Sequence, residues 1–168
     1  MGHTRAGGEG AGEQDKRLRT LAVWLASAAQ QPQAVFECWR RGACASLTVG
    51  TSWDAVRVEF AFACRALGIL KEQRCHIGPH LVGGVDRSIW VLLPLGTAHR
   101  LTGLERVAVQ ETGQQLLAPA PYAYSGDRVW LLPGVRDHDG ELSKRLTSTD
   151  DLRKALGIAL QQRSRVGR

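Results

Sequence analysis

Several residues of this chain have side chains that bind metals, but their spacing completes no metal site. Cys75, His76 and His80 carry zinc-binding groups, whereas a structural zinc site takes four ligands and only the remote His99 offers a fourth. Residues 137–140, Asp-His-Asp-Gly, have the composition of a calcium-loop fragment without the remaining ligands. We therefore expect no bound metal or other cofactor, and a solvated turn at 137–140.

Nucleophilic and phosphate-binding motifs are also incomplete. Ser46, Ser52 and Ser88 lie in no Gly-x-Ser-x-Gly motif, and we interpret them as turn or strand residues. Gly83 and Gly84 are followed by no Lys-Ser/Thr pair, so they predict a turn and not a phosphate loop. The cysteines have no CxxC spacing, and we expect reduced thiols with Cys64 in the core: Cys38, Cys44, Cys64 and Cys75.

Basic and aromatic residues indicate a different chemistry. The formal net charge is +6 and the sequence pI is about 9.6, a balance that favours polyanions. Proteins that bind single-stranded nucleic acid stack bases on aromatic side chains along a basic groove. Core packing is the alternative interpretation for Trp24, Trp90 and Trp130. The candidate nucleic-acid-binding residues are Arg40, Arg41, Arg87, Trp90, Arg128 and Trp130, with Tyr122 and Tyr124 as further aromatic candidates.

Apolar periodicity and turn residues predict the elements that must position these side chains. A helix from Arg17 ends before Pro32, because proline disfavours helix in the residue that precedes it. Gly42 ends a second helix. The predicted order is a disordered Gly-rich tail at 1–16, helices at 17–31 and 33–41, strands at 45–49 and 54–58, a helix at 59–70, a strand-rich block at 76–132, a helix at 150–162 and a basic tail at 163–168.

This order predicts one α+β domain over residues 17–162, with a mainly antiparallel sheet packed by two to four helices. The sequence contains no run of 18 apolar residues, so we expect no membrane span. The N-terminus has no apolar segment of the kind found in secretory signals. We therefore expect a cytoplasmic protein.

The segment 83–133 resembles a known family in the order of its strands and turns. It contains Pro-Leu-Gly-Thr at 94–97, a strand closing in Ala-Pro-Ala-Pro at 118–121, and a Ser-Gly turn before an aromatic strand at 125–130. These features are similar to the N-terminal domain of bifunctional DNA primase/polymerases of the archaeo-eukaryotic primase-like superfamily. The likeness is to its small stand-alone actinobacterial members in particular, and it covers about a third of the chain.

The positions that would carry catalysis depart from that family. The resemblance implies two acidic residues on one strand, a His on the next and an Asp on a third, which together hold two metal ions. Here the His position falls at Ser88 and the third-strand Asp position at Ala108. The paired acids should lie near 53–57, where only Asp54 is found, and Glu59 has the wrong spacing to share its strand face. The resemblance therefore implies a degenerate active site with no catalytic residues.

Three hypotheses follow. The first is a non-catalytic primase-like module that binds single-stranded nucleic acid or nucleotide in an accessory or regulatory role. The second is a protein–protein interaction module that reuses the same fold. The third is an active DNA primase/polymerase, which would need carboxylates from outside the aligned strands, such as Asp86 or Glu111.

Overall fold

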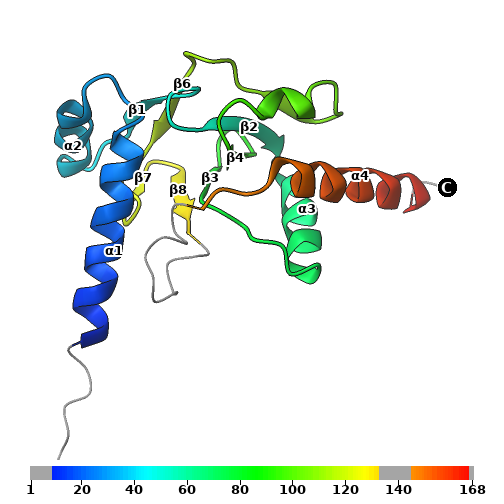
Figure 1. The fold of residues 1–168 in the computed structure, drawn as a ribbon, viewed down its shortest axis with the longest axis horizontal. Coiled ribbons are helices and arrows are strands. Elements are labelled where there is room, and N and C mark those ends of the chain that lie inside the picture. Colours follow the sequence, from blue (N-terminus) through cyan, green and yellow to red (C-terminus); the bar gives the residue numbers. More distant parts are fainter. Residues whose placement is uncertain (1–8, 133–144, 167–168) are drawn as a thin grey trace, which may run out of the picture.

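A six-stranded antiparallel sheet lies at the centre of the structure, in the order β5-β2-β4-β3-β8-β7 (Figure 1). The computed structural model describes residues 9–132 and 145–166. A second, two-stranded antiparallel sheet pairs β1 with β6. The strands are β1 (Ala45–Thr48), β2 (Asp54–Glu59), β3 (His80–Gly83), β4 (Ser88–Leu93), β5 (Val107–Val109), β6 (Gln115–Ala118), β7 (Tyr124–Ser125) and β8 (Arg128–Leu131).

Four α-helices and one short 3-10 helix are found among the described residues, which confirms the predicted α+β fold with a mainly antiparallel sheet. None of the helices in 9–132 and 145–166 has both the length and the apolar character to cross a membrane. The helices are α1 (Glu9–Ala26), α2 (Pro32–Arg40), α3 (Phe60–Glu72), α4 (Thr149–Val166) and the 3-10 helix η1 (Ala98–Leu101).

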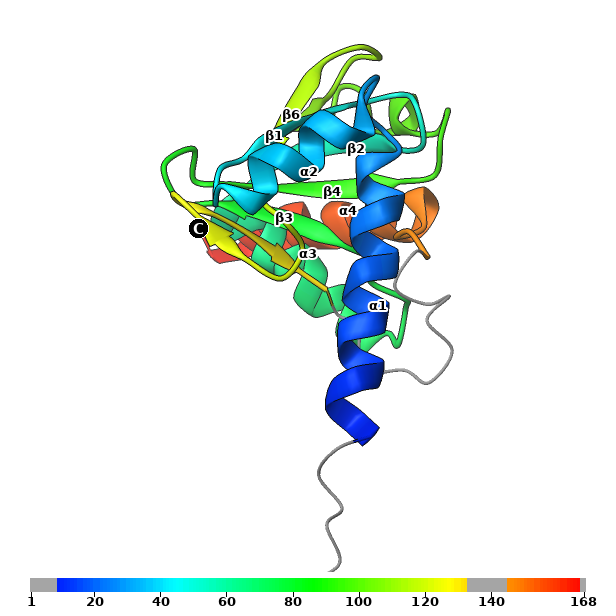
Figure 2. The same cartoon turned by 90° about the vertical axis from the view of Figure 1, so that its left-hand side faces the viewer.

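The large sheet is covered differently on its two faces (Figures 1 and 2). On one face, here called the α1 face, Leu81, Trp90 and Trp130 form a core with α1, α2 and the small sheet. On the opposite face, the α3 face, Val56 and Ile89 pack in a second core with α3 and α4. Every residue of β4 is buried, because this strand contributes alternate side chains to both cores.

The terminal helices are longer than the sequence predicts. Residues 9–16, expected to be disordered, form the first turns of α1, where the ion pairs Glu13–Arg17 and Asp15–Arg19 have the i,i+4 spacing that supports a helix. Residues 163–166, expected in a basic tail, belong to α4. The predicted turn at 137–140 lies outside the described residues.

His80 makes the stability of the fold depend on pH. Its side chain is only 4% exposed, and its Nδ1 lies 3.0 Å from the carbonyl oxygen of Gly78. Burial lowers the pKa of His80 below its ordinary value of 6.5, against a smaller raising effect of the Gly78 hydrogen bond. The unfolded chain therefore binds a proton more readily than the folded chain, and stability falls as pH drops below about 6.5.

We expect urea unfolding at pH 7.5 and pH 5 to show this loss, and His80→Gln to reduce the difference between the two pH values. Glutamine is the control because its amide keeps a donor for the Gly78 carbonyl without titrating. An equal loss of stability in the variant and in the unaltered chain would show that other groups cause it.

Candidate nucleic-acid interface

Arg57 is an exposed charged residue on an interior strand of the large sheet. It lies on β2 and is flanked in register by Ala108 of β5 and Trp90 of β4. Among the described residues, its guanidinium has no ion-pair or hydrogen-bond partner. Arg57 was not one of the sequence candidates, although a charge inside the apolar run Ala55–Val58 was a signal that this position faces solvent.

Ser88 and Ala108, the proposed degenerate positions, lie on the same face as Arg57. They belong to β4 and β5, the two strands that flank β2. Ser88 is buried and its hydroxyl donates a hydrogen bond to the carbonyl oxygen of Asp86 at 2.9 Å. The Ala108 methyl group therefore lies directly beside Arg57, and the small Ser88 hydroxyl lies diagonally from it, opposite Glu59, where the resemblance implies an Asp and a His.

Asp54, the third of the proposed degenerate positions, does not belong to this group. Strand alternation puts its side chain on the α3 face, opposite Arg57. Its carboxylate is 9% exposed, and Oδ2 accepts hydrogen bonds from the backbone N–H groups of Thr97 and Ala98, each at 2.9 Å. Asp54 therefore caps the start of η1, which is a structural role.

Glu59 is the acidic residue of β2 that shares the α1 face with Arg57. Its Oε2 lies 2.7 Å from Nη1 of Arg106, and this hydrogen bond lowers the pKa of Glu59. The carboxylate is thus ionised and held by an arginine. Within the described residues, no three His, Cys, Asp or Glu side chains are grouped closely enough to hold a metal ion, and this includes Cys75, His76 and His80.

Trp90 and Trp130 are core residues and are not available to stack on bases, which corrects their place among the candidates. Their side chains are 5% and 4% exposed. Nε1 of Trp130 donates a hydrogen bond to the carbonyl oxygen of Pro119 at 2.8 Å. Both side chains point from the middle of the sheet into the core that α1 and α2 cover, and this burial could not be assigned from residue type alone.

Arg128 covers Trp90 and is held by three contacts. Its Cζ lies 4.6 Å from the centroid of the Trp90 ring, a cation–π contact. Nη2 is 2.8 Å from Oδ2 of Asp86, and Nη1 donates to the carbonyl oxygen of Leu117 at 2.6 Å. With 16% of its side chain exposed, Arg128 contributes positive potential to this face but has few donors left for a ligand.

The remaining basic candidates lie at the end of α2 and in the β3–β4 turn. Ser125 Oγ donates to the carbonyl oxygen of Gly42 at 2.7 Å, which places the end of α2, with exposed Arg40 and Arg41, beside β7. Arg87 is exposed in the turn between β3 and β4. We call these residues the basic strip: Arg40, Arg41, Arg57, Arg87 and Arg128.

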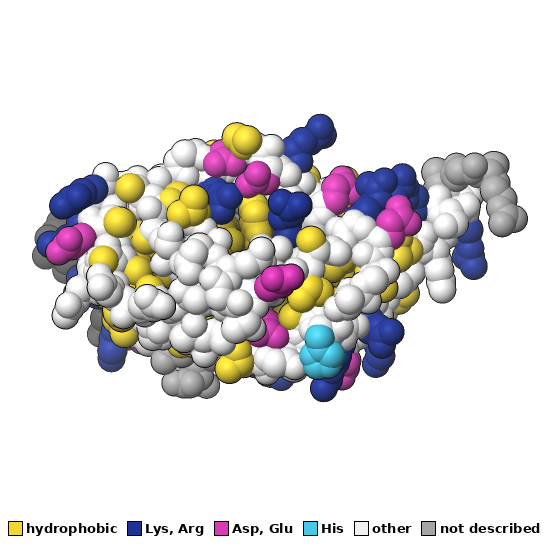
Figure 3. All heavy atoms as spheres, turned by 90° about the horizontal axis from the view of Figure 1, so that it is seen from above, with side chains coloured by type: hydrophobic (Ala, Val, Ile, Leu, Met, Phe, Trp, Pro, Cys, Tyr) yellow, Lys and Arg dark blue, Asp and Glu magenta, His cyan; other side chains and the backbone are white. Residues whose placement is uncertain are grey.

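The basic strip extends across the sheet from β7 to β2. Four strand spacings of about 4.8 Å separate these strands, which gives a width of roughly 19 Å. Seen from above, the molecule has a hollow in which hydrophobic side chains lie between Lys or Arg side chains, with Asp and Glu side chains nearby (Figure 3).

The exposed tyrosines lie at the edge of the sheet. Tyr122 is 60% exposed and Tyr124 is 71% exposed. Tyr124 pairs with Val129 and so points to the α3 face, whereas its neighbour Ser125 points to the α1 face. The basic strip therefore contains no exposed aromatic side chain from this strand, and its chemistry is that of cations.

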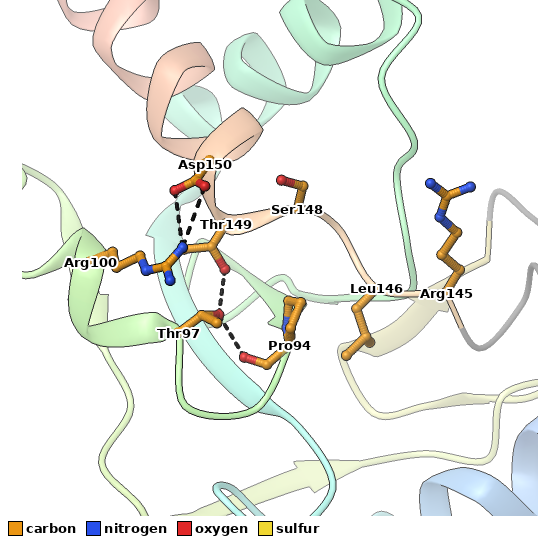
Figure 4. A pocket seen from close by; sticks show the side chains of 8 residues that line it. All are labelled: Pro94, Thr97, Arg100, Arg145, Leu146, Ser148, Thr149 and Asp150. Atoms are coloured by element: carbon orange, nitrogen blue, oxygen red, sulfur yellow. Dashed lines mark hydrogen bonds and ion pairs between the residues drawn. The ribbon is translucent and has the colours of Figure 1, made fainter.

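A separate pocket of about 460 Å³ lies at the start of α4 (Figure 4). Its polar side chains largely bind one another. Arg100 forms an ion pair with Asp150 at 3.3 Å, and the Thr97 hydroxyl lies 2.5 Å from that of Thr149. Figure 4 shows Arg145 pointing away from this pair. These contacts fasten α4 to the turn before η1, so we assign this pocket a structural role.

In comparisons with known proteins, no protein-family model matches this chain, and no curated protein or solved structure is significantly similar to it.

Proposed function

We propose that this protein is a non-catalytic module that binds the phosphates of single-stranded nucleic acid or of a nucleotide along the basic strip. The observation that carries the proposal is Arg57, which is exposed and unpaired among the described residues, lies directly beside Ala108 and has Ser88 as its diagonal neighbour on β4. A guanidinium at this point supplies the positive charge that metal ions supply in a primase-like active site. A phosphate can then be bound without a metal ion.

The other members of the strip have graded roles in this proposal. Arg40 and Arg41 are exposed at the far end and are suited to a second phosphate, because guanidinium groups bind phosphate oxygens through paired hydrogen bonds. Arg87 adds a third contact from the β3–β4 turn. Arg128 adds charge but is held by Asp86. Few base contacts are expected, so binding should depend weakly on sequence.

The test is a fluorescence-anisotropy titration of a labelled single-stranded oligonucleotide of about 12 nucleotides, a length within the range of single-domain sites. We expect saturable binding that weakens steeply as salt rises, because each neutralised phosphate releases counterions. Binding should be the same with and without magnesium. Competition by mononucleotides would show whether a single phosphate group is sufficient.

Arg57→Glu is expected to lower the affinity by at least about tenfold, because it replaces an attraction for phosphate with a repulsion. The matched control is Arg153→Glu, an equal change of charge at an exposed position of α4. An equal loss in both variants would mean that only net charge matters. Salt-insensitive binding, or no binding at low salt, would refute the proposal.

A protein–protein interaction module is the second candidate. It is favoured by the exposed apolar and aromatic side chains around the large sheet, which include Val85 at 82%, Tyr124 at 71% and Leu131 at 45%. An active polymerase has less support, because Asp86 is held by Arg128. Magnesium-dependent incorporation of nucleotides would favour polymerase activity over both binding hypotheses.

A further inference from the structure

The outer edge of β1 carries backbone groups that no other strand pairs. β1 is an edge strand of the small sheet. The Val49 N–H bonds to the Gln114 carbonyl at 2.9 Å, and hydrogen-bonded pairs alternate along an antiparallel ladder, so Leu47 and Ala45 also direct their backbone groups toward β6. Ser46 and Thr48 therefore direct their backbone groups away from β6. Thr48 N–H is bound to the Ala28 carbonyl at 3.3 Å. Among the described residues, no backbone partner is found for the N–H and C=O of Ser46.

A groove of about 430 Å³ lies along this edge, between β1 and α2. The α2 side presents Ala34, Val35 and Cys38, and the β1 side presents Ala45, Ser46 and Thr48. No charged residue lines the groove. Small side chains on the helix leave room for another backbone beside the strand, which is the arrangement used when an extended peptide is added to a sheet edge next to a helix.

The two arginines at the end of α2 give this groove a charged end. Arg41 follows Cys38 by three residues and so continues the groove-facing side of the helix. Arg40 and Arg41 are both exposed. The connection from α2 to β1 is short, so these arginines lie toward the Ala45 end of the strand. A strand added antiparallel to β1 would have its C-terminal end there.

We infer that the β1–α2 groove binds the C-terminal segment of a partner protein as an added antiparallel strand, with its terminal carboxylate at Arg40 and Arg41. The Ser46 backbone groups bond to the peptide backbone. The uncharged groove accepts small or β-branched side chains. This site is distinct from Arg57 and the middle of the basic strip, although it shares Arg40 and Arg41 with the end of that strip.

The test is titration of the full chain with a fluorescein-labelled pool of hexapeptides that has Val, Ile or Thr at every position. One pool has a free C-terminal carboxylate and the other has a C-terminal amide. We expect saturable binding of the carboxylate pool and at least tenfold weaker binding of the amide pool. Equal affinity for both pools, or no binding of either, would overturn the inference.

Two substitutions test the contribution of the β1 edge and the groove to peptide binding separately from that of the arginines. Ser46→Pro removes the free N–H, and it preserves the fold because this N–H points away from β6. Ala34→Gln fills the groove from an exposed helical position. Both are expected to lower peptide affinity at least tenfold, with Ser46→Ala as the control that keeps the backbone N–H. Unchanged affinity in folded Ala34→Gln would contradict the site.

The same variants distinguish this inference from the proposed function. Ala34→Gln and Ser46→Pro should leave oligonucleotide binding unchanged, whereas Arg57→Glu should leave peptide binding unchanged. Chemical-shift changes caused by the carboxylate pool should centre on Ala34, Cys38 and Ser46. Changes centred on Arg57 would assign the peptide to the basic strip and overturn the inference.

Discussion

Trp90→Ala is expected to lower the free energy of unfolding by about 4 kcal/mol, the middle of the range for removing a large aromatic side chain from a core. The ring is 5% exposed and packs in the core between the large sheet, α1 and α2. Its loss also removes the surface on which Arg128 rests at 4.6 Å. Urea denaturation followed by circular dichroism measures the change.

Trp90→Phe is the control for this experiment. Phenylalanine keeps an aromatic ring below Arg128 and most of the buried volume, so we expect less than half of the alanine effect. If the tryptophan instead contributed to ligand binding by stacking, its alanine variant would keep its stability and lose oligonucleotide affinity. That result would reverse our assignment of Trp90 to the core.

Asp54→Ala is expected to cost about 3 kcal/mol, because it leaves the part-buried N–H group of Thr97 and the buried N–H group of Ala98 without their acceptor. Equilibrium unfolding in urea again provides the measurement. The expected loss is one of stability, since Asp54 lies on the face opposite Arg57 and contacts no part of the basic strip. Oligonucleotide affinity of the folded fraction should therefore stay the same.

Asp54→Asn tests the geometric basis of this prediction. The amide oxygen of asparagine can accept both hydrogen bonds at nearly the same position, so most of the stability should be retained. A loss as large as that of the alanine variant would show that the negative charge, and not the two accepted hydrogen bonds, is what η1 requires.

The sequence predicted the middle of the fold best, where local signals and tertiary packing agree. Pro32 and Gly42 bracket α2, and the predicted strand at 54–58 and helix at 59–70 match β2 and α3 closely. The ends were less well predicted. Helix formation in 9–16 occurs despite two glycines, and it is accompanied by i,i+4 ion pairs, a spacing in the sequence that the Gly-rich composition obscured.

The candidate site was harder to predict, because the role of each residue depends on which face of the sheet its side chain occupies. Asp54 resembled a metal ligand until its partners, 43 and 44 residues away, were known. Trp90 and Trp130 have the same residue type as exposed stacking residues, and only the packing of α1 and α2 over them determines their role. Arg57 became a candidate once the register placed it beside Ala108 and diagonally from Ser88.

The burial of β4 on both faces also determines which parts of the protein can unfold locally. β4 is hydrogen-bonded to a strand on each side and contributes to both cores, so it is the segment that separates only when the whole domain unfolds. β7 has two residues and one neighbour, and it can detach locally at little cost. Arg57, at one end of the basic strip, therefore lies next to the most stable strand of the sheet. Arg40 and Arg41, at the other end, lie beside the strand that can detach. A ligand that bridges the two would hold the edge of the sheet in place.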